Sequence, residues 1–362
     1  MFPKTSLTEL FGIRYPIIQA PMAGVGITAD MVAGVSNAGG LGSFAAAMLP
    51  PEAIRQGIAE VRARTTMPFN VNMFVLERSK ADAAEVRAAL ELLRPIREEL
   101  DLPPGEVPAQ FCEDPEAQFE AVLEARPAVA SFTFGALKAE KIAALHSRGA
   151  RVIGTATTVE EARAWKTAGA DAICAQGSDA GSHRGTFLGD FEAAMVGTMS
   201  LVPQIVDAVR LPVIAAGGIM DGRGIAASLM LGAAGVQMGT AFLTCADSGV
   251  MEEYKKLLRQ ARENQTRVSR IYTGKPARGL VNEFMRRLAP REREISPYPI
   301  QNALTMPIRA ASKKAGRTDF MSLWAGQGAG MSRGLPAAEL VATLVRETEA
   351  ALSGASRAAA KP

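Results

Sequence analysis

The chain has 362 residues, of which 48% are hydrophobic, and carries 40 lysines and arginines against 37 aspartates and glutamates. A net charge of +3, with acidic residues interrupting every basic cluster, does not indicate a nucleic-acid partner. No stretch approaches the roughly 18 consecutive apolar residues of a membrane span, and residues 1–16 lack a signal-peptide core, so we expect a cytoplasmic protein with no membrane partner. The three cysteines are far apart and no metal-ligand spacing occurs, so we expect neither disulfides nor a metal.

The first glycine-rich turn lies in "PIIQAPMAGVGITADM", residues 16–31, and contains Gly24-x-Gly26-x-x-Ala29. A Rossmann dinucleotide site would require an acidic residue at the end of the following strand. The next apolar segment, "GLGSFAAAMLPP", has no carboxylate before Glu52, and a Pro-Met pair lengthens the turn. The glycines therefore indicate that a flat ring approaches the main chain closely, rather than a dinucleotide grip.

Eight short runs have the composition of buried strands and are bounded by glycine, proline or polar residues. They cover residues 16–20, 40–45, 69–74, 128–135, 151–156, 172–177, 212–218 and 235–242. Segments with helical apolar spacing separate them, and this alternation is typical of a parallel sheet with crossover helices. The sequence therefore predicts an α/β fold in which eight such units close a TIM barrel.

Two further parts extend the predicted barrel, which we place at residues 1–245. Residues from about 80 to 127 exceed what one crossover needs and contain several prolines, so we expect a helix and a loop inserted near the barrel mouth. From 246 to 362 the pattern changes to charged helices around a loop-rich stretch, residues 270–335. We expect this C-terminal helical region to pack on the barrel and to contribute to the active-site mouth.

Glycines occur where a barrel commonly binds phosphate, in the loops after the seventh and eighth strands. Gly217 and Gly218 end the seventh strand, and the eighth runs through "QMGT", residues 237–240. The helix that begins in "DGRGIAASLMLG", residues 221–232, could direct its N-terminal amides to the same point. These features predict a phosphate site.

Amide side chains and a histidine complete the predicted site. Asn70 and Asn72 alternate to one face of the third strand and Gln176 closes the sixth, where amides could bond the edge of a flavin ring. Of the two histidines, His146 ends an amphipathic helix and is expected at the surface. His183 lies in the glycine-rich loop "AQGSDAGSHRGTF", beside Arg184 and close to Asp179, where an imidazole could accept a proton or bind an anion.

Seven segments, in this order, resemble the class I nitronate monooxygenases, formerly called 2-nitropropane dioxygenases: "PIIQAPMAGV", "NAGGLGS", "PFNVNMF", "AQGSDAGSHRG", "AAGGIMDGRG", "GVQMGTAF" and "WAGQGAG". The resemblance covers about residues 8–345 and implies an FMN-dependent TIM barrel that oxidises alkyl nitronates with dioxygen to a carbonyl compound and nitrite. By position it makes His183 the active-site residue beside the substrate. It also implies that FMN is bound by Pro21, Met22, Ala23, Asn72, Gln176, Gly181, Gly217, Gly218, Gln237, Met238, Gly239 and Thr240.

Other functions stay open on the sequence. Flavin-dependent enoyl-acyl carrier protein reductases share the "AAGGIxDGRG" and "QMGT" elements, and NAD(P)H:quinone reductases are a third possibility. Some bacterial monooxygenases carry further tyrosines and a lysine after the "YP" pair, where this chain has Asn302 and Met306, so the substrate is undefined. A phosphosugar isomerase would need a carboxylate base at a strand end, and a nucleotide dehydrogenase a loop cysteine; neither appears. A non-catalytic flavin store is also conceivable. For the monooxygenase we expect His183, with Arg184, to contact the anionic nitronate.

Overall fold

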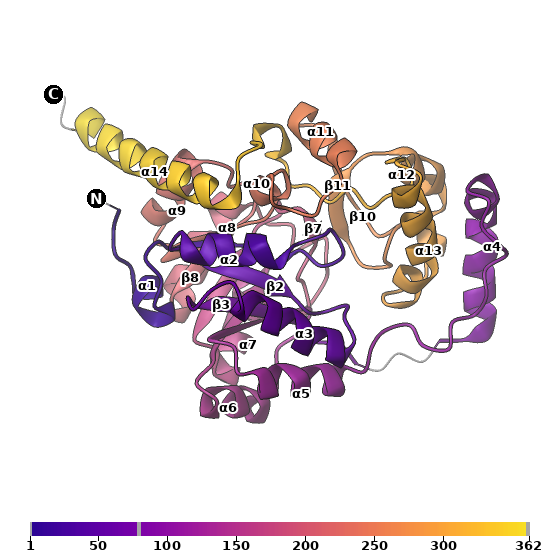
Figure 1. The fold of residues 1–362 in the computed structure, drawn as a ribbon, viewed down its shortest axis with the longest axis horizontal. Coiled ribbons are helices and arrows are strands. Elements are labelled where there is room, and N and C mark those ends of the chain that lie inside the picture. The colour runs from indigo at the N-terminus through magenta and orange to yellow at the C-terminus, as the bar shows by residue number, and fades with distance from the viewer. Residues whose placement is uncertain (1, 78–80, 360–362) are drawn as a thin grey trace.

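All eight predicted runs form parallel strands in the computed structural model, which describes residues 2–77 and 81–359. The strands are β1 Ile17–Gln19, β2 Gly42–Ala45, β3 Phe69–Phe74, β4 Val129–Thr133, β5 Arg151–Ala156, β6 Ala172–Gln176, β8 Val213–Ala216 and β9 Gly235–Met238. They follow the order β1-β9-β8-β6-β5-β4-β3-β2, and a parallel bridge between Ile18 and Leu41 joins the two edges. The predicted TIM barrel is confirmed (Figure 1).

Helices alternate with these strands around the barrel (Figure 1). They are α1 Ser6–Phe11, α2 Ala29–Asn37, α3 Pro51–Arg62, α5 Pro115–Ala125, α6 Ala139–Ser147, α7 Val159–Ala168, α8 Thr198–Val209, α9 Gly222–Met230 and α10 Thr240–Leu243. Several begin at a side-chain oxygen that accepts an N–H of the first turn, as Thr28 does from Met31 and Thr158 does from Glu161. Such caps explain why the helices start where they do.

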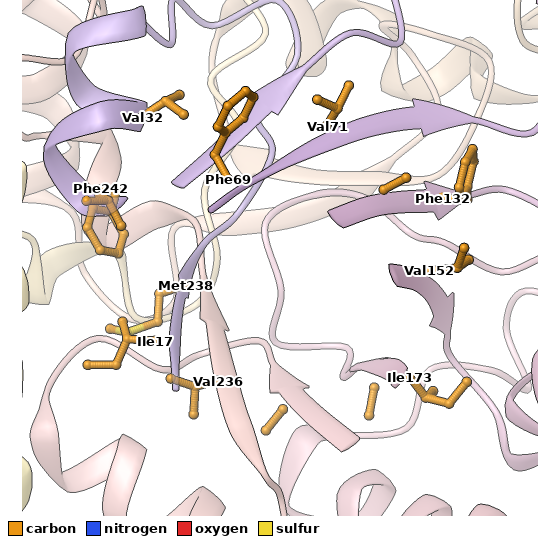
Figure 2. Packing of buried hydrophobic residues seen from close by; sticks show 14 of the residues in the cluster. Ile17, Val32, Phe69, Val71, Phe132, Val152, Ile173, Val236, Met238 and Phe242 are labelled. Atoms are coloured by element: carbon orange, nitrogen blue, oxygen red, sulfur yellow. The ribbon is translucent and has the colours of Figure 1, made fainter. Parts of the chain in front are cut away.

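The strand residues alternate between two apolar layers, because successive side chains of a strand point to opposite faces. Val71, Val152, Ile173 and Val236 belong to the layer between the strands and the surrounding helices (Figure 2). The other layer fills the barrel with residues such as Ile153, and α1 contributes two side chains to it, Leu7 and Phe11. The core thus makes the strands a rigid frame for the loops at their carboxyl ends.

The insertion contains a long helix, α4 Ala83–Glu99, which lies beside α13 Ile300–Lys314 at the edge of the molecule (Figure 1). Val86 and Leu93 of α4 share a second apolar core with Leu304 and Ile308 of α13. The following helix, α5, packs against α3 and β3 as a crossover helix of the barrel does. The inserted segment therefore ends before α5, which belongs to the barrel.

The C-terminal region is more ordered than the sequence predicted. It contains α11 Glu252–Gln260, β10 Thr266–Ser269, β11 Ala277–Leu280, α12 Glu283–Leu288, η1 Ala289–Glu294, α13, η2 Ala329–Met331 and α14 Ala337–Ala359. The prediction of a loop-rich stretch at 270–335 is wrong over α12 and α13, because α13 continues through Pro307. β10 and β11 form a small antiparallel sheet with β7 Ser182–His183, and α14 packs against α9 and α2. Within the described residues, no helix is long and apolar enough to cross a membrane.

Candidate active site

A cavity that is partly open to solvent lies at the carboxyl ends of the barrel strands. The end of β3 and the loops after β1, β6, β8 and β9 line it together with parts of the C-terminal region. All of the residues assigned from the resemblance line this one cavity: Pro21, Met22, Ala23, Asn72, Gln176, Gly181, His183, Gly217, Gly218, Gln237, Met238, Gly239 and Thr240. Its position is that of a cofactor site in a TIM barrel.

One end of the cavity presents unpaired backbone donors. Gly217 and Gly218 have φ of +119° and +71°, a left-handed conformation that favours glycine. The N–H groups of Gly218 and Gly239 have no hydrogen-bond acceptor among the described residues. Backbone donors without acceptors can bind an anion, so the loops of Gly218 and Gly239 form a candidate cradle for the phosphate of a flavin nucleotide.

Two carboxylates near this cradle accept hydrogen bonds from backbone N–H groups instead of contacting a ligand. Asp221 accepts hydrogen bonds from the N–H groups of Arg223 (2.9 Å) and Gly224 (3.2 Å), so it occupies the amides at the start of α9. The expectation that α9 directs free N-terminal amides to the phosphate is therefore wrong. Asp179 accepts from the N–H and hydroxyl of Thr198, both at 2.8 Å, and so braces the loop behind Gly218 rather than pairing with His183.

Polar groups on neighbouring strands suit the edge of a ring. Asn72 donates through Nδ2 to the carbonyl (3.1 Å) and hydroxyl (3.0 Å) of Ser131, while its Oδ1 has no partner in the described part of the chain. Thr133 and Thr155, with hydroxyls 3.2 Å apart, also line the cavity and were missed from the sequence. Asn70 is bonded to Ser131 deeper in the barrel and does not line the cavity.

Gln176 ties the histidine loop to the end of β6. Its Nε2 donates to the carbonyl oxygen of His183 at 2.9 Å, and its Oε1 accepts the N–H of Gly185 at 2.8 Å. The side chain thus holds both sides of the loop, and only one Nε2 hydrogen is left for a ligand. Gln176 therefore positions the loop that carries His183 and keeps one N–H hydrogen for a ligand.

His183 is held in a short strand rather than in a free loop. β7 pairs with β11, opposite Ala277, and the preceding Ser182 has φ of +63°, a strained value for a residue other than glycine. Four aromatic rings surround the imidazole, with centroids between 5.4 and 6.2 Å from its own: Phe74, Phe134, Tyr298 and Trp324. The imidazole of His183 therefore borders the cavity among rings that exclude water, and the pairing of β7 with β11 restricts its movement.

His183 is hydrogen-bonded to Thr273 and is neutral in the folded protein. Its Nε2 lies 2.9 Å from the hydroxyl of Thr273, which also lies 3.1 Å from the carbonyl oxygen of Lys275 and accepts the N–H of Lys275 at 3.3 Å. The hydroxyl can donate to this carbonyl or to the imidazole, which puts the proton of the neutral ring on Nε2 in the first case and on Nδ1 in the second. Burial, followed by the charges of Lys275 and Arg309, lowers the pKa of His183 to about 3. The imidazole is neutral near pH 7 and a weak base.

Arg184 does not reach the site, so the predicted contact between this residue and a nitronate is wrong. Its side chain is 1% exposed and does not line the cavity. The guanidinium donates to the carbonyl oxygens of Gln176 (3.0 Å), Gly177 (2.5 Å) and Ala194 (3.2 Å). Arg184 follows His183 in extended backbone, where neighbouring side chains point to opposite sides.

The C-terminal region closes the other side of the cavity. Trp324 and Gly326, from the "WAGQG" segment singled out in the sequence, line it together with Asn302. Arg309, on α13, also lines it and was missed. The signal was an arginine on the apolar face of a helix, four residues after the buried Thr305.

The remaining polar candidates lie elsewhere. His146, in the last turn of α6, is half-exposed, and its Nε2 lies 2.8 Å from a carboxylate oxygen of Asp171. Among the described residues, no three or more histidines, cysteines, aspartates or glutamates are arranged to hold a metal ion.

Comparison with known proteins agrees with this geometry. The family model described as nitronate monooxygenase matches residues 4–347. A nitronate monooxygenase of Pseudomonas aeruginosa is 46% identical over 345 residues, which are 94% of this chain and 98% of that protein. Among solved structures, a nitroalkane oxidase from Streptomyces ansochromogenes has 40% identity and a TM-score of 0.89, over 96% of this chain and 99% of its own. FabK from Thermotoga maritima has 30% identity and a TM-score of 0.76, over 98% of both chains.

The match spans nearly the whole chain, so it includes both the barrel and the C-terminal residues that line the cavity. Membership of this family implies a flavin cofactor, and the cavity has unpaired backbone donors and polar strand ends that such a group could contact. The chain belongs to the nitronate monooxygenase family and is a flavin-dependent oxidoreductase.

Proposed function

We propose that this protein binds FMN and oxidises alkyl nitronates with dioxygen to a carbonyl compound and nitrite. The observation that carries the proposal is the layout of one cavity. Its walls combine unpaired backbone donors of Gly218 and Gly239, polar strand ends, and His183 among aromatic rings. A cradle for one phosphate matches FMN, whereas FAD would need additional partners for an adenylate.

The residues divide the work between cofactor and substrate. Gly217, Gly218 and residues 237–240 would hold the phosphate, and Asn72 and Gln176 would meet the ring edge. FMN, when bound, takes the electrons of the nitronate and passes them to dioxygen. His183, neutral and held beside Thr273, would lie next to the nitro group of an already anionic substrate, and the surrounding rings would exclude water.

A nitronate supplies its own electrons, so the reaction requires no nicotinamide. This separates the proposal from an NAD(P)H-dependent enoyl or quinone reductase built on the same barrel. The test is to mix the purified yellow protein anaerobically with a short alkyl nitronate, and separately with NADH and NADPH, while recording the flavin spectrum. Oxygen uptake and nitrite release would then be measured in air.

We expect the nitronate to reduce the flavin, with nitrite as product in air, and NAD(P)H to reduce it slowly or not at all. Rapid reduction by NAD(P)H with no nitrite from any nitronate would overturn the proposal in favour of a reductase. Heat-released cofactor identified as FAD would overturn the assignment of FMN.

A further inference from the structure

Arg309 is a cation in the cavity wall without a counter-ion. Its Nη2 donates to the backbone carbonyl (2.9 Å) and to the side-chain oxygen (2.8 Å) of Asn302, both of which are neutral. Its Nε is sealed from solvent and has no acceptor. Within the described residues, no carboxylate forms an ion pair with it. Arg309 is half-buried, and a guanidinium in a cavity wall without a counter-ion is suited to bind an anionic ligand.

The other two cations near His183 bond protein groups from outside the cavity, although Arg184 Nε, like Arg309 Nε, has no acceptor in the described part of the chain. Arg184 is bonded to loop carbonyls, as described above. Lys275 donates from Nζ to the carbonyl of Thr186 at 3.2 Å and lies 4.6 Å from the centre of the Phe134 ring. Neither side chain lines the cavity. Arg309 is therefore the cation that has donors to spare where a substrate would lie.

Burial lowers the pKa of Arg309 to about 10, against the effect of the nearby Tyr272 and Tyr298 hydroxyls, so it is still charged at neutral pH. Its position also opposes acid–base chemistry at His183, because a second positive charge there is disfavoured. The site is thus suited to receive a negative charge and poorly suited to remove a proton.

We propose that Arg309 binds the negative charge of the nitronate and makes this protein selective for nitronates over the neutral nitroalkanes from which they form. The inference rests on the proposed function for the identity of the substrate. Nη1 has no acceptor among the described residues and, unlike Nε, is not sealed from solvent, so its N–H groups can donate to an anion whose charge is spread over two nitro oxygens. A neutral nitroalkane offers weaker acceptors and needs a base that the site lacks.

The experiment titrates the FMN-loaded protein with sodium nitrate, a planar anion with similar oxygens, and follows the flavin spectrum. The loaded protein is used because its phosphate cradle is then filled. Neutral variants Arg309→Met and Arg309→Gln should weaken nitrate binding by about 10- to 100-fold, the range for hydrogen bonds to a charged group. Arg309→Lys, which keeps the charge, should recover part of the affinity. KM for the nitronate should follow the nitrate Kd more closely than kcat does.

The matched control is Lys275→Met, which removes the other cation that acts on His183 without removing a group from the cavity wall. It should change the nitrate Kd less than about threefold, since the charge alone is screened and more distant. In the wild type, kcat/KM for the nitronate should exceed that for the parent nitroalkane by at least about 100-fold. This ratio should fall in the neutral Arg309 variants.

The proposal is overturned if both neutral variants retain wild-type nitrate affinity, or if Lys275→Met weakens binding as much as they do. Arg309→Gln keeps an acceptor and donor beside Asn302, so the test stands if Arg309→Met does not fold. If nitrate binding depends on Arg309 but no nitronate is turned over, the anion site is supported and the proposed reaction fails. The two conclusions are thereby tested separately.

Discussion

The neutral state of His183 has a consequence for stability that can be measured without any substrate. In the unfolded chain a histidine has a pKa near 6.5, whereas burial, Lys275 and Arg309 lower the pKa of His183 to about 3 in the folded protein. Tyr298, whose own pKa is raised by burial, and the rings around the imidazole supply no compensating negative charge. Replacing His183 by glutamine should therefore remove a source of acid sensitivity.

The direction and size follow from proton linkage. Between pH 3 and pH 6.5 the unfolded state binds one proton that the folded state does not, so the free energy of unfolding rises with pH in this window. The slope approaches about 1.4 kcal/mol per pH unit well below 6.5 and vanishes above it. Integrated from pH 6.5 down to pH 5, the loss from this residue is about 1.6 kcal/mol.

Urea unfolding of the FMN-loaded wild type and His183→Gln at several pH values from 5 to 7.5 would measure this difference. Carboxylates titrate in both proteins, so their effect cancels in the comparison. The two stability curves should run parallel above pH 7 and diverge below 6.5, with the wild type losing more. His146→Gln, which removes the other histidine, is the control. Parallel curves down to pH 5 for His183→Gln would refute the claim that the folded imidazole is neutral.

Two further changes test the cofactor cradle and the histidine loop. Gly217→Ala places a methyl group 2.7 Å from the Thr198 hydroxyl oxygen, at a residue with φ of +119°, so this variant should lose most of its bound flavin on purification. Gly149→Ala is the control for backbone strain. Gly149 has φ of +84° and open space around it, so this variant should keep its flavin. Flavin content equal in both variants would contradict the cradle. Glu161→Gln should lower the free energy of unfolding by about 1–3 kcal/mol in urea, because the carboxylate accepts the N–H of Thr157, which precedes α7, at 2.6 Å and the N–H of Leu188 at 2.9 Å. Wild-type stability would show that an amide satisfies the same donors.

The barrel could be predicted because its signals are local. Each strand is a short apolar run with glycine or proline at its ends, and the glycine pair at 217–218 marks a backbone turn wherever it occurs. Once strands are ordered in a barrel, their carboxyl ends must meet, so Asn72, Gln176 and the "QMGT" loop were predicted to line one cavity, as they do.

The wrong prediction for Arg184 concerns the direction of its side chain, not the position of its backbone. Arg184 was expected beside His183 because the two are adjacent in sequence, yet adjacent residues in extended backbone diverge, and Arg184 turns toward Ala194. Arg309 was missed because it is far from the barrel's cavity residues in the sequence. It is more than 120 residues from His183 in the chain, and the packing of α13 against α4, with the hydrogen bond from Thr305 to the carbonyl of Tyr272, brings it to the cavity.

This division has a consequence for how substrate preference varies in such a fold. The groups suited to the cofactor come from the ends of barrel strands, where the closed sheet allows little movement. Asn302, Arg309 and Trp324, which also line the cavity, come from the C-terminal region, which has a core of its own. A substitution there, such as one that adds or removes a cation on α13, should change the charge that the cavity accepts without disturbing the proposed phosphate cradle. A solved relative named as a nitroalkane oxidase and a curated relative named as a nitronate monooxygenase both match nearly the whole chain, so we expect the residues that decide between such substrates to lie on α13.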